Sequence, residues 1–424
     1  MVLNWTGIKE NTRLAVETLV AHKFRAMLTI LGVFIGVMVI VLVAAVLNGF
    51  RQTIVDQTES FGTRNVYVWR FPFIQTGRLP ASVLNRKPLT LDDGKALQEE
   101  VPAAEYVSVS LIYGLNRPGE IPLAPPPVRY RDKLMSRPRF IGNFPVGALV
   151  LNRPVDNGRY FTDSENEHRA DVCVIAFNVV EALFPAQDPV GKTINVLGHD
   201  FEVVGSLPKD KAGAFGSENP EDNDILIPYY TFRKILPTAD DNFIVVQMRE
   251  GRMTEGIEEV EQVLRRRRKV SLFDDDNFAI GTADMFISTF DDITRVVFLV
   301  SLIISSVAFM VGGVGVMNIM LVAVTERTRE IGIRKAVGAR RADIIWQFLT
   351  EAIALTGTGG MAGLASGWLI AIAVTALIPS LVMTIPLWAA AGGFILSVFV
   401  GVVFGMYPAI KAAWLDPIAA LRHE

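Results

Sequence analysis

Four long apolar runs dominate the hydropathy pattern of this chain. They are nearly free of charge and cover residues 26–50, 296–324, 346–382 and 385–410. Each run is longer than the roughly 20 residues that a helix needs to cross a bilayer core of about 30 Å. The pattern therefore predicts an α-helical membrane protein with four transmembrane helices.

Lysine and arginine residues cluster at one end of each predicted span. They precede the first run, fill the segment between the second and third runs, and follow the fourth at Lys411 and Arg422. Because these residues are enriched in cytoplasmic loops, both termini are expected on the cytoplasmic side of the membrane. No clear cleavage site follows the first run, so we interpret it as an uncleaved anchor.

The long segment between the first two runs predicts a large α+β extracytoplasmic domain inserted between the first and second spans. Strands are expected at 64–69, 171–175, 224–228 and 243–247, and a hairpin at 193–207 that turns near Gly198. Thr90 is expected to cap one helix, and a charged helix is expected at 253–268. The basic stretch 129–139 follows a proline-rich segment, which favours an irregular loop or a sheet edge.

These expectations divide the chain into nine segments. A cytoplasmic amphipathic helix occupies 1–24, the first transmembrane helix 25–50, and the extracytoplasmic domain 51–284. A stalk and the second transmembrane helix occupy 285–324, followed by a cytoplasmic coupling helix and loop at 325–343. The third transmembrane helix at 344–378, an external turn at 379–386, the fourth transmembrane helix at 387–410 and a cytoplasmic tail at 411–424 complete the chain.

The sequence AQDPVGKT at 186–193 fits a relaxed phosphate-binding pattern. Such a loop needs a helix whose first amide groups cradle the phosphates. Here two prolines stiffen the loop and the following residues alternate as a strand does. We therefore do not predict a nucleotide site at this position.

The apolar runs hold few ionisable side chains. Glu351 is the only one inside a run, whereas ion-coupled transporters need such groups near the middle of the bilayer. Energy for any transport is therefore expected from outside the chain. The net charge of −3 gives no indication of nucleic acid, and the single Cys173 cannot form an intramolecular disulfide.

Small residues are spaced four apart in three of the runs. Gly32 and Gly36 could serve a subunit interface or packing within the chain, because such ridges allow close contact between helices. For Gly359, Gly363 and Gly367, and for Gly401 and Gly405, packing within the chain is the favoured interpretation.

The segment 325–345, hereafter the basic segment, carries six basic residues between two apolar runs. A simple interpretation is a loop that only orients the protein in the membrane. The spacing of Glu326 and Glu330, the apolar pair Ile331 and Ile333, and a helix stop at Gly338 instead favour an amphipathic helix that docks into a groove on a partner protein.

Several stretches of the chain resemble one family. The sequence at 312–353 is GGVGVMNIMLVAVTERTREIGIRKAVGARRADIIWQFLTEAI, which is similar to the hallmark of MacB-type permeases of the FtsX-like ABC transporter superfamily. HKFRAMLTILGVFIGV at 22–37 and YPAIKAAWLDPIAALRHE at 407–424 resemble the first span and the C-terminus of that family. PVGKTINV and FEVVG resemble its periplasmic core domain.

The resemblance implies a multi-pass permease subunit of the bacterial inner membrane that works mechanically. ATP hydrolysis would occur in a separate ABC ATPase, which would hold the ATP and magnesium, and no catalytic, cofactor or metal residue is assigned to this chain. A second permease copy, identical or paralogous, a periplasmic adaptor and an outer-membrane duct are the implied partners. The residues expected to couple to the ATPase are Glu326, Arg327, Arg329, Glu330, Ile331 and Arg334. Movements of the periplasmic domain would drive efflux or export of a substrate, and the alternatives are regulation of a cell-wall hydrolase and release of lipoproteins.

Overall fold

The computed structural model describes residues 23–60, 62–73, 77–114, 125–210, 219–239, 241–271, 273–378 and 381–421, with the backbone alone at 23–29 and 56–60. The chain divides into two compact units. The helical unit is made of Met1–Gln52 and Phe290–Glu424, and the sheet unit is Thr53–Thr289. The amphipathic helix predicted at 1–24 falls almost entirely outside the described residues.

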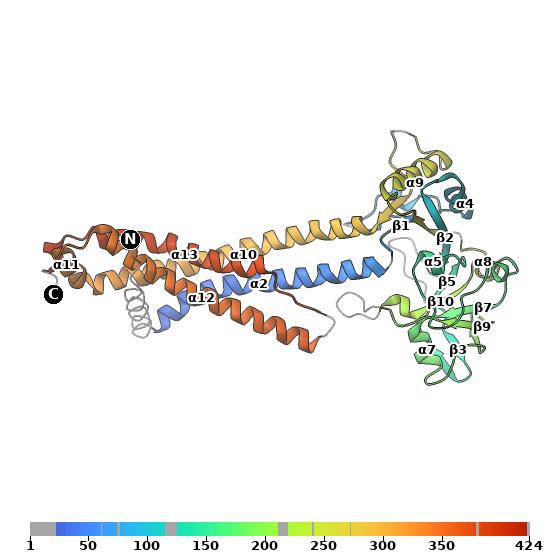
Figure 1. Cartoon of the computed structure of the whole chain (residues 1–424), viewed down its shortest axis with the longest axis horizontal. Coiled ribbons are helices and arrows are strands. Elements are labelled where there is room, and N and C mark those ends of the chain that lie inside the picture. The colour runs from blue at the N-terminus through green and yellow to red at the C-terminus, as the bar shows by residue number, and fades with distance from the viewer. Residues whose placement is uncertain are drawn as a thin grey trace. The chain divides into compact units, whose positions relative to one another are not determined.

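Long helices build the helical unit (Figure 1). They are α2 (Lys23–Ser60), α10 (Ala283–Glu326), α12 (Arg341–Leu377) and α13 (Leu387–Ala413), and two short helices, α11 (Thr328–Ala336) and α14 (Pro417–Leu421), lie at the ends of α10 and α13 in the chain. Within the described residues, α2, α10, α12 and α13 are long and apolar enough to cross a membrane. A helix that could span a membrane is therefore present at each of the four predicted positions, although α2 continues ten residues beyond the predicted end of the first span.

Glycines allow the long helices to pack closely. A Cβ atom on Gly32 would lie 2.7 Å from Cα of Gly312, so α2 and α10 are in backbone contact there. Gly363 faces the backbone of α2 at Phe34, and Gly401 faces Thr356 on α12. Gly36 of α2 lies against the ring of Phe309 on α10.

These contacts show what the glycine ridges pack against. Gly32 and Gly36 both contact α10 of the same chain, which corresponds to the alternative of packing within the chain. The ridges of the third and fourth runs also pack within the chain, as predicted.

Within the described residues, the sheet unit is built on a twelve-stranded sheet of order β12-β1-β11-β2-β5-β10-β7-β9-β8-β3-β4, with β6 paired to β9. β5 and β10 pair in parallel, as do β7 and β9, and the other described pairs are antiparallel. The strands are β1 (Asn65–Trp69), β2 (Ala104–Ile112), β3 (Val128–Tyr130), β4 (Lys133–Met135), β5 (Arg139–Asn143), β6 (Asn157–Gly158), β7 (Val172–Ile175), β8 (Thr193–Val196), β9 (His199–Ser206), β10 (Asp224–Pro228), β11 (Asn242–Met248) and β12 (Ala279–Thr282).

Short helices complete the sheet unit and help to form its core. They are α3 (Ala81–Leu84), α4 (Leu91–Glu100), α5 (Gly147–Val150), α6 (Asp163–Glu167), α7 (Phe177–Leu183), the 3-10 helix η2 (Pro220–Asn223), α8 (Tyr229–Ile235) and α9 (Met253–Arg267). The largest core joins inward residues of the strands, such as Phe140 and Ile244, to Leu97 of α4, Phe232 of α8 and Leu264 of α9. Burial of these apolar side chains is the main stabilising contribution to this unit.

Most predicted elements of this unit are present. The strands predicted at 64–69, 171–175, 224–228 and 243–247 are β1, β7, β10 and β11, and the hairpin turns at Leu197 and Gly198 between β8 and β9. Thr90 caps α4 by accepting a hydrogen bond from the amide of Asp93. The basic stretch 129–139 contains β3 and β4 at the end of the sheet, which is the edge alternative.

The loop at 186–193 is followed by a strand and not by a helix, as predicted. β8 begins at Thr193, directly after the Gly-Lys pair, so the loop leads into a strand. No helix N-terminus follows it to receive a phosphate group.

Candidate functional site

The basic segment begins with a break between two helices. α10 ends at Glu326, Arg327 lies between the helices with φ of −101°, and α11 starts at Thr328. The coupling helix predicted within 325–343 corresponds to α11 and the last residues of α10, and Glu326 and Glu330 lie on either side of the break at Arg327.

Arg327 makes the contact that holds this break in place. Its Nη1 lies 3.3 Å from Oε1 of Glu351, whose side chain is only 5% exposed. Glu351 belongs to α12, so the ion pair joins the α10–α11 junction to the next long helix. A carboxylate so deeply buried needs a charged partner, because an unpaired buried charge is strongly unfavourable.

Two further contacts fix α11 to the end of α13. The ammonium group of Lys335 donates to the carbonyl oxygens of Ala413 at 2.8 Å and Leu415 at 2.6 Å. These carbonyls belong to the last turn of α13 and the residues after it, where carbonyls lack partners within a helix. A Cβ atom on Gly332 would lie 2.8 Å from the Cβ atom of Ala420 in α14, so α11 and α14 pack tightly.

Ile331 lies on the inner face of α11. It is 3% exposed and packs in a core with residues of α10, α12 and α13, including Val324, Phe348 and Ala412. Ile331 and Ile333 are two residues apart and point in different directions on a helix. Ile333 accordingly lies on the outer face, where it is 45% exposed.

The outer face of α11 combines charge with exposed apolar surface. Arg334 forms an ion pair with Glu330 at 2.5 Å and also donates to Gln347 of α12. Ile333 and Val337 are exposed beside them. These residues border an open hollow of about 430 Å³ that is lined by Ile333, Arg334, Val337, Ala339, Asp343, Ile344 and Gln347.

The turn into α12 closes the hollow on its other side. Gly338 has φ of +106°, a conformation that favours glycine, and it ends α11 as predicted. The side chain of Asp343 accepts a hydrogen bond from the amide of Arg340 and so caps the start of α12. Arg341 stacks on the ring of Trp414 at 4.1 Å, a cation–π contact with the residue that follows α13.

The six predicted coupling residues thus fall into two groups. Glu326, Arg329 and Glu330 are exposed and Arg334 is half-buried at the hollow, whereas Arg327 and Ile331 point toward other helices of the chain. Sequence reasoning named Ile333 together with Ile331 without separating their faces, and it missed Val337 as an outer-face residue. The four-residue spacing of Ile333 and Val337 was the available signal.

Comparisons with known proteins assign the chain to a family. Residues 26–263 match the model of the MacB-like periplasmic core domain, and residues 302–417 match that of the FtsX-like permease C-terminal region. The chain belongs to the MacB-type, FtsX-like family of ABC transporter permeases. The resemblance noted in the sequence is confirmed, and the basic segment lies wholly within the FtsX-like match.

The curated relatives of this permease are longer than the chain itself. The pyoverdine export ATP-binding/permease protein PvdT of Pseudomonas syringae is 33% identical over 99% of this chain and 60% of that protein. The macrolide export ATP-binding/permease protein MacB of Neisseria meningitidis is 33% identical over 98% of this chain and 61% of that protein. This permease therefore spans about three fifths of the length of the curated relatives that it matches.

One solved structure aligns with part of this permease. It is the periplasmic region of MacB from Actinobacillus actinomycetemcomitans, and it covers 56% of this chain and 97% of that chain, with 15% identity and a TM-score of 0.44.

Proposed function

We propose that this permease couples ATP hydrolysis by an ABC ATPase to movement of its extracytoplasmic domain, and that this movement drives export of a substrate. The observation that carries the proposal is the outer face of α11. It offers an ion pair, two exposed apolar side chains and an adjoining hollow on a base fixed by Arg327, Ile331 and Lys335. Protein grooves of this kind accept an element of a partner protein.

The continuity of α10 supports the relay part of the proposal. α10 is one helix of 44 residues that begins directly after β12 of the sheet unit and ends at the basic segment. A helix of this length is about 66 Å long at 1.5 Å per residue, more than twice the thickness of a bilayer core. A displacement of α11 would be passed to α10 because only Arg327 separates the two helices in the chain, and to α12 through the ion pair of Arg327 with Glu351.

The proposed orientation places the basic segment in the cytoplasm and the sheet unit outside. The lysines and arginines beside the spans support this orientation. Docking then uses Glu326, Arg329, Glu330 and Arg334, joined by Ile333 and Val337. Arg327 and Ile331 act behind this face by holding α11 in position.

A second permease copy is part of the same proposal. Ile303, Val307 and Val311 of α10 are more than half exposed and lie four residues apart on one helix face. The only cysteine of the chain is the buried Cys173. Val307→Cys is therefore expected to form a disulfide-linked dimer in membranes, whereas Val316→Cys, at a buried position of α10, is not. Equal crosslinking of the two variants would contradict this interface.

A charge swap at Glu330 and Arg334 tests the coupling site. The permease is purified from membranes with the ABC ATPase bound to it, and ATPase binding and ATP hydrolysis are measured. Arg334→Glu alone breaks the intrachain ion pair and reverses the surface charge, and we expect it to abolish coupling. Glu330→Arg with Arg334→Glu keeps an ion pair but reverses its direction.

The swapped variant separates two roles of the pair. If the ATPase contacts these side chains, the swapped variant stays uncoupled. Restored coupling would mean that the pair only supports α11. Lys411→Glu is the control, because Lys411 is an exposed basic residue at the end of α13 and is expected to leave coupling intact. Unchanged binding and hydrolysis in Arg334→Glu would refute the docking site.

A further inference from the structure

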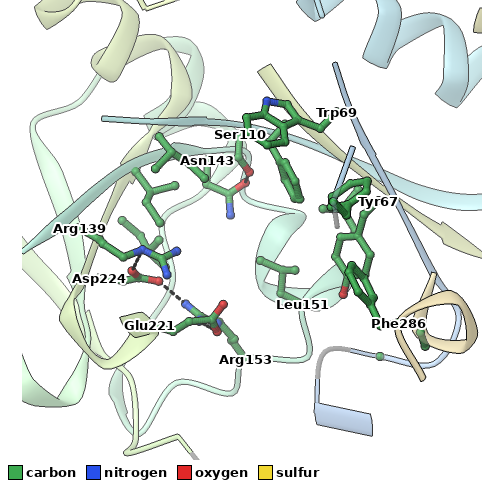
Figure 2. A pocket seen from close by; sticks show the side chains of 18 of the residues that line it. Tyr67, Trp69, Ser110, Arg139, Asn143, Leu151, Arg153, Glu221, Asp224 and Phe286 are labelled. Atoms are coloured by element: carbon green, nitrogen blue, oxygen red, sulfur yellow. Dashed lines mark hydrogen bonds and ion pairs between the residues drawn. The ribbon is translucent and has the colours of Figure 1, made fainter. Parts of the chain in front are cut away.

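The sheet unit contains a cavity of about 470 Å³ on one face of its sheet (Figure 2). Its floor is made by alternate residues of five neighbouring strands, β1, β11, β2, β5 and β10. Alternate side chains of a strand point to opposite faces, and the intervening residues of these strands fill the main core. One face of this part of the sheet therefore packs against the main core, and the other face lines the cavity.

Aromatic side chains form the apolar wall of the cavity. Tyr67 and Phe73 each lie 6.1 Å from the ring of Phe243, and Phe73 lies 5.7 Å from the ring of Phe286. Trp69 lines the same wall, next to Tyr67 in Figure 2. Rings of this kind give a ligand a large apolar contact area.

The opposite wall carries a compact group of charges. Asp224 is 1% exposed, and its carboxylate lies 3.0 Å from Nε of Arg139 and 2.8 Å from Nη1 of Arg153. Arg153 also pairs with Glu221. Two positive and two negative side chains thus balance at this end of the cavity.

Hydrogen-bond donors remain available beside this group. Nε of Arg139 lies 3.0 Å from Asp224, and no hydrogen bond from its Nη atoms is found among the residues that the structure describes. Asn143 is 1% exposed, and its Oδ1 accepts from the hydroxyl groups of Ser108 and Ser110. Its Nδ2 has one long contact of 3.5 Å to the hydroxyl of Tyr160 and points into the open space in Figure 2.

We propose that this cavity binds an uncharged amphipathic small molecule. Its apolar body lies against the aromatic wall, and an acceptor oxygen such as an ester or amide carbonyl accepts hydrogen bonds from Arg139 and Asn143. The volume falls within the range of about 300–1,000 Å³ typical of small-molecule sites. A charged head group is disfavoured, because the polar end is already neutral and burying a further unpaired charge is costly.

The test compares how probes with different head groups bind to the full-length permease in lipid nanodiscs. Three photoreactive probes share one dodecyl chain and end in a methyl ester, a carboxylate or a trimethylammonium group, and crosslinked peptides are identified by mass spectrometry. The ester is expected to label the peptides that carry Trp69 and Phe286, with a half-saturating concentration roughly tenfold lower than that of either charged probe. This comparison needs no variant and no ATP, so it is independent of the proposed coupling function.

Variants of the permease then locate the head group and the apolar chain of the bound ester probe. Arg139→Met is expected to raise the half-saturating concentration of the ester by roughly tenfold, the loss of one good hydrogen bond to a charged donor. Leu151→Trp fills the cavity and is expected to abolish this labelling, whereas Arg129→Met, at an exposed position of β3, leaves it unchanged. Labelling confined to residues 26–50, 296–324, 346–382 and 385–410 would overturn the site. Tighter binding of the carboxylate or ammonium probe would overturn the uncharged ligand.

Discussion

Arg327 and Glu351 form an ion pair across 24 residues of sequence, with Nη1 of the arginine 3.3 Å from Oε1 of the glutamate. Glu351 is almost fully buried in α12, and this contact gives its carboxylate a charged partner. The pair also marks the point where α10 ends and α11 begins. The same interaction therefore satisfies a buried carboxylate and fixes the direction of the proposed docking helix.

The first prediction concerns the stability of this pair. Arg327→Met and Glu351→Met are each expected to lower the free energy of unfolding by about 3 kcal/mol, because each leaves a buried charge without its partner. The double variant is expected to lose much less than the sum, since two apolar side chains then face each other. Denaturant unfolding in detergent measures the cycle. Arg329→Met, at an exposed position, is the control, and simple additivity of the two single variants would show that the residues do not interact.

The sequence indicated one half of this pair. Glu351 is the only ionisable residue inside an apolar run, which marks it as a residue that needs a partner. Nothing local indicated Arg327, because no glycine or proline accompanies the helix break there. The break depends on tertiary contacts of Arg327 and Ile331, and such contacts cannot be derived from helix propensity alone.

The long apolar helices were predictable because length and hydropathy are sufficient evidence for a span. The partners of the glycine ridges were not, since a ridge on α2 can face either another helix or another chain. The cavity residues also gave no clear signal. Strands such as β11 and β10 are apolar on both sides, a pattern that predicts full burial and does not distinguish a filled face from a hollow one.

The second prediction uses the contact of Gly32 with Gly312. Gly32→Ala places a methyl group 2.7 Å from backbone Cα, and we expect a loss of about 1–3 kcal/mol in the free energy of unfolding from overpacking. Gly357→Ala is the matched control, because a Cβ atom there meets nothing within 4 Å. Both variants are compared by thermal unfolding in the same detergent. Equal stabilities would show that α2 and α10 are not in close contact.

The third prediction distinguishes two acids at the polar end of the cavity. Burial raises the pKa of Asp224 above its ordinary value, and the two arginines oppose this effect. Asp224→Ala leaves both arginines without their shared partner and is expected to cost about 3 kcal/mol or more in the free energy of unfolding. Glu221→Ala removes a more exposed carboxylate, whose ion pair within the described part of the chain is with Arg153, and is expected to cost clearly less. Denaturant unfolding ranks the two variants, and the reverse order would contradict the central place of Asp224.

The last prediction is a pH dependence in the sheet unit. Glu165 accepts hydrogen bonds from Arg159 at 2.7 and 2.8 Å and from the amide of Thr162 at 2.7 Å. The hydrogen bonds from Arg159 are the main cause that lowers the pKa of Glu165 from 4.5 to about 2. Because the folded pKa lies below the unfolded one, the ionised form stabilises the fold above pH 4.5, and this contribution is lost as the pH falls toward 2.

Glu165→Gln removes this contribution, so the difference in free energy of unfolding from the unaltered chain is expected to be constant above pH 4.5 and to shrink between pH 4.5 and 2. Denaturant unfolding at a series of pH values, followed by the amide exchange of α6, measures the difference. Glu167→Gln alters an exposed carboxyl on the same short helix and serves as the control for the substitution itself. A difference that persisted unchanged at pH 2 would mean that Glu165 stabilises α6 through its shape and neutral hydrogen bonds rather than through its charge.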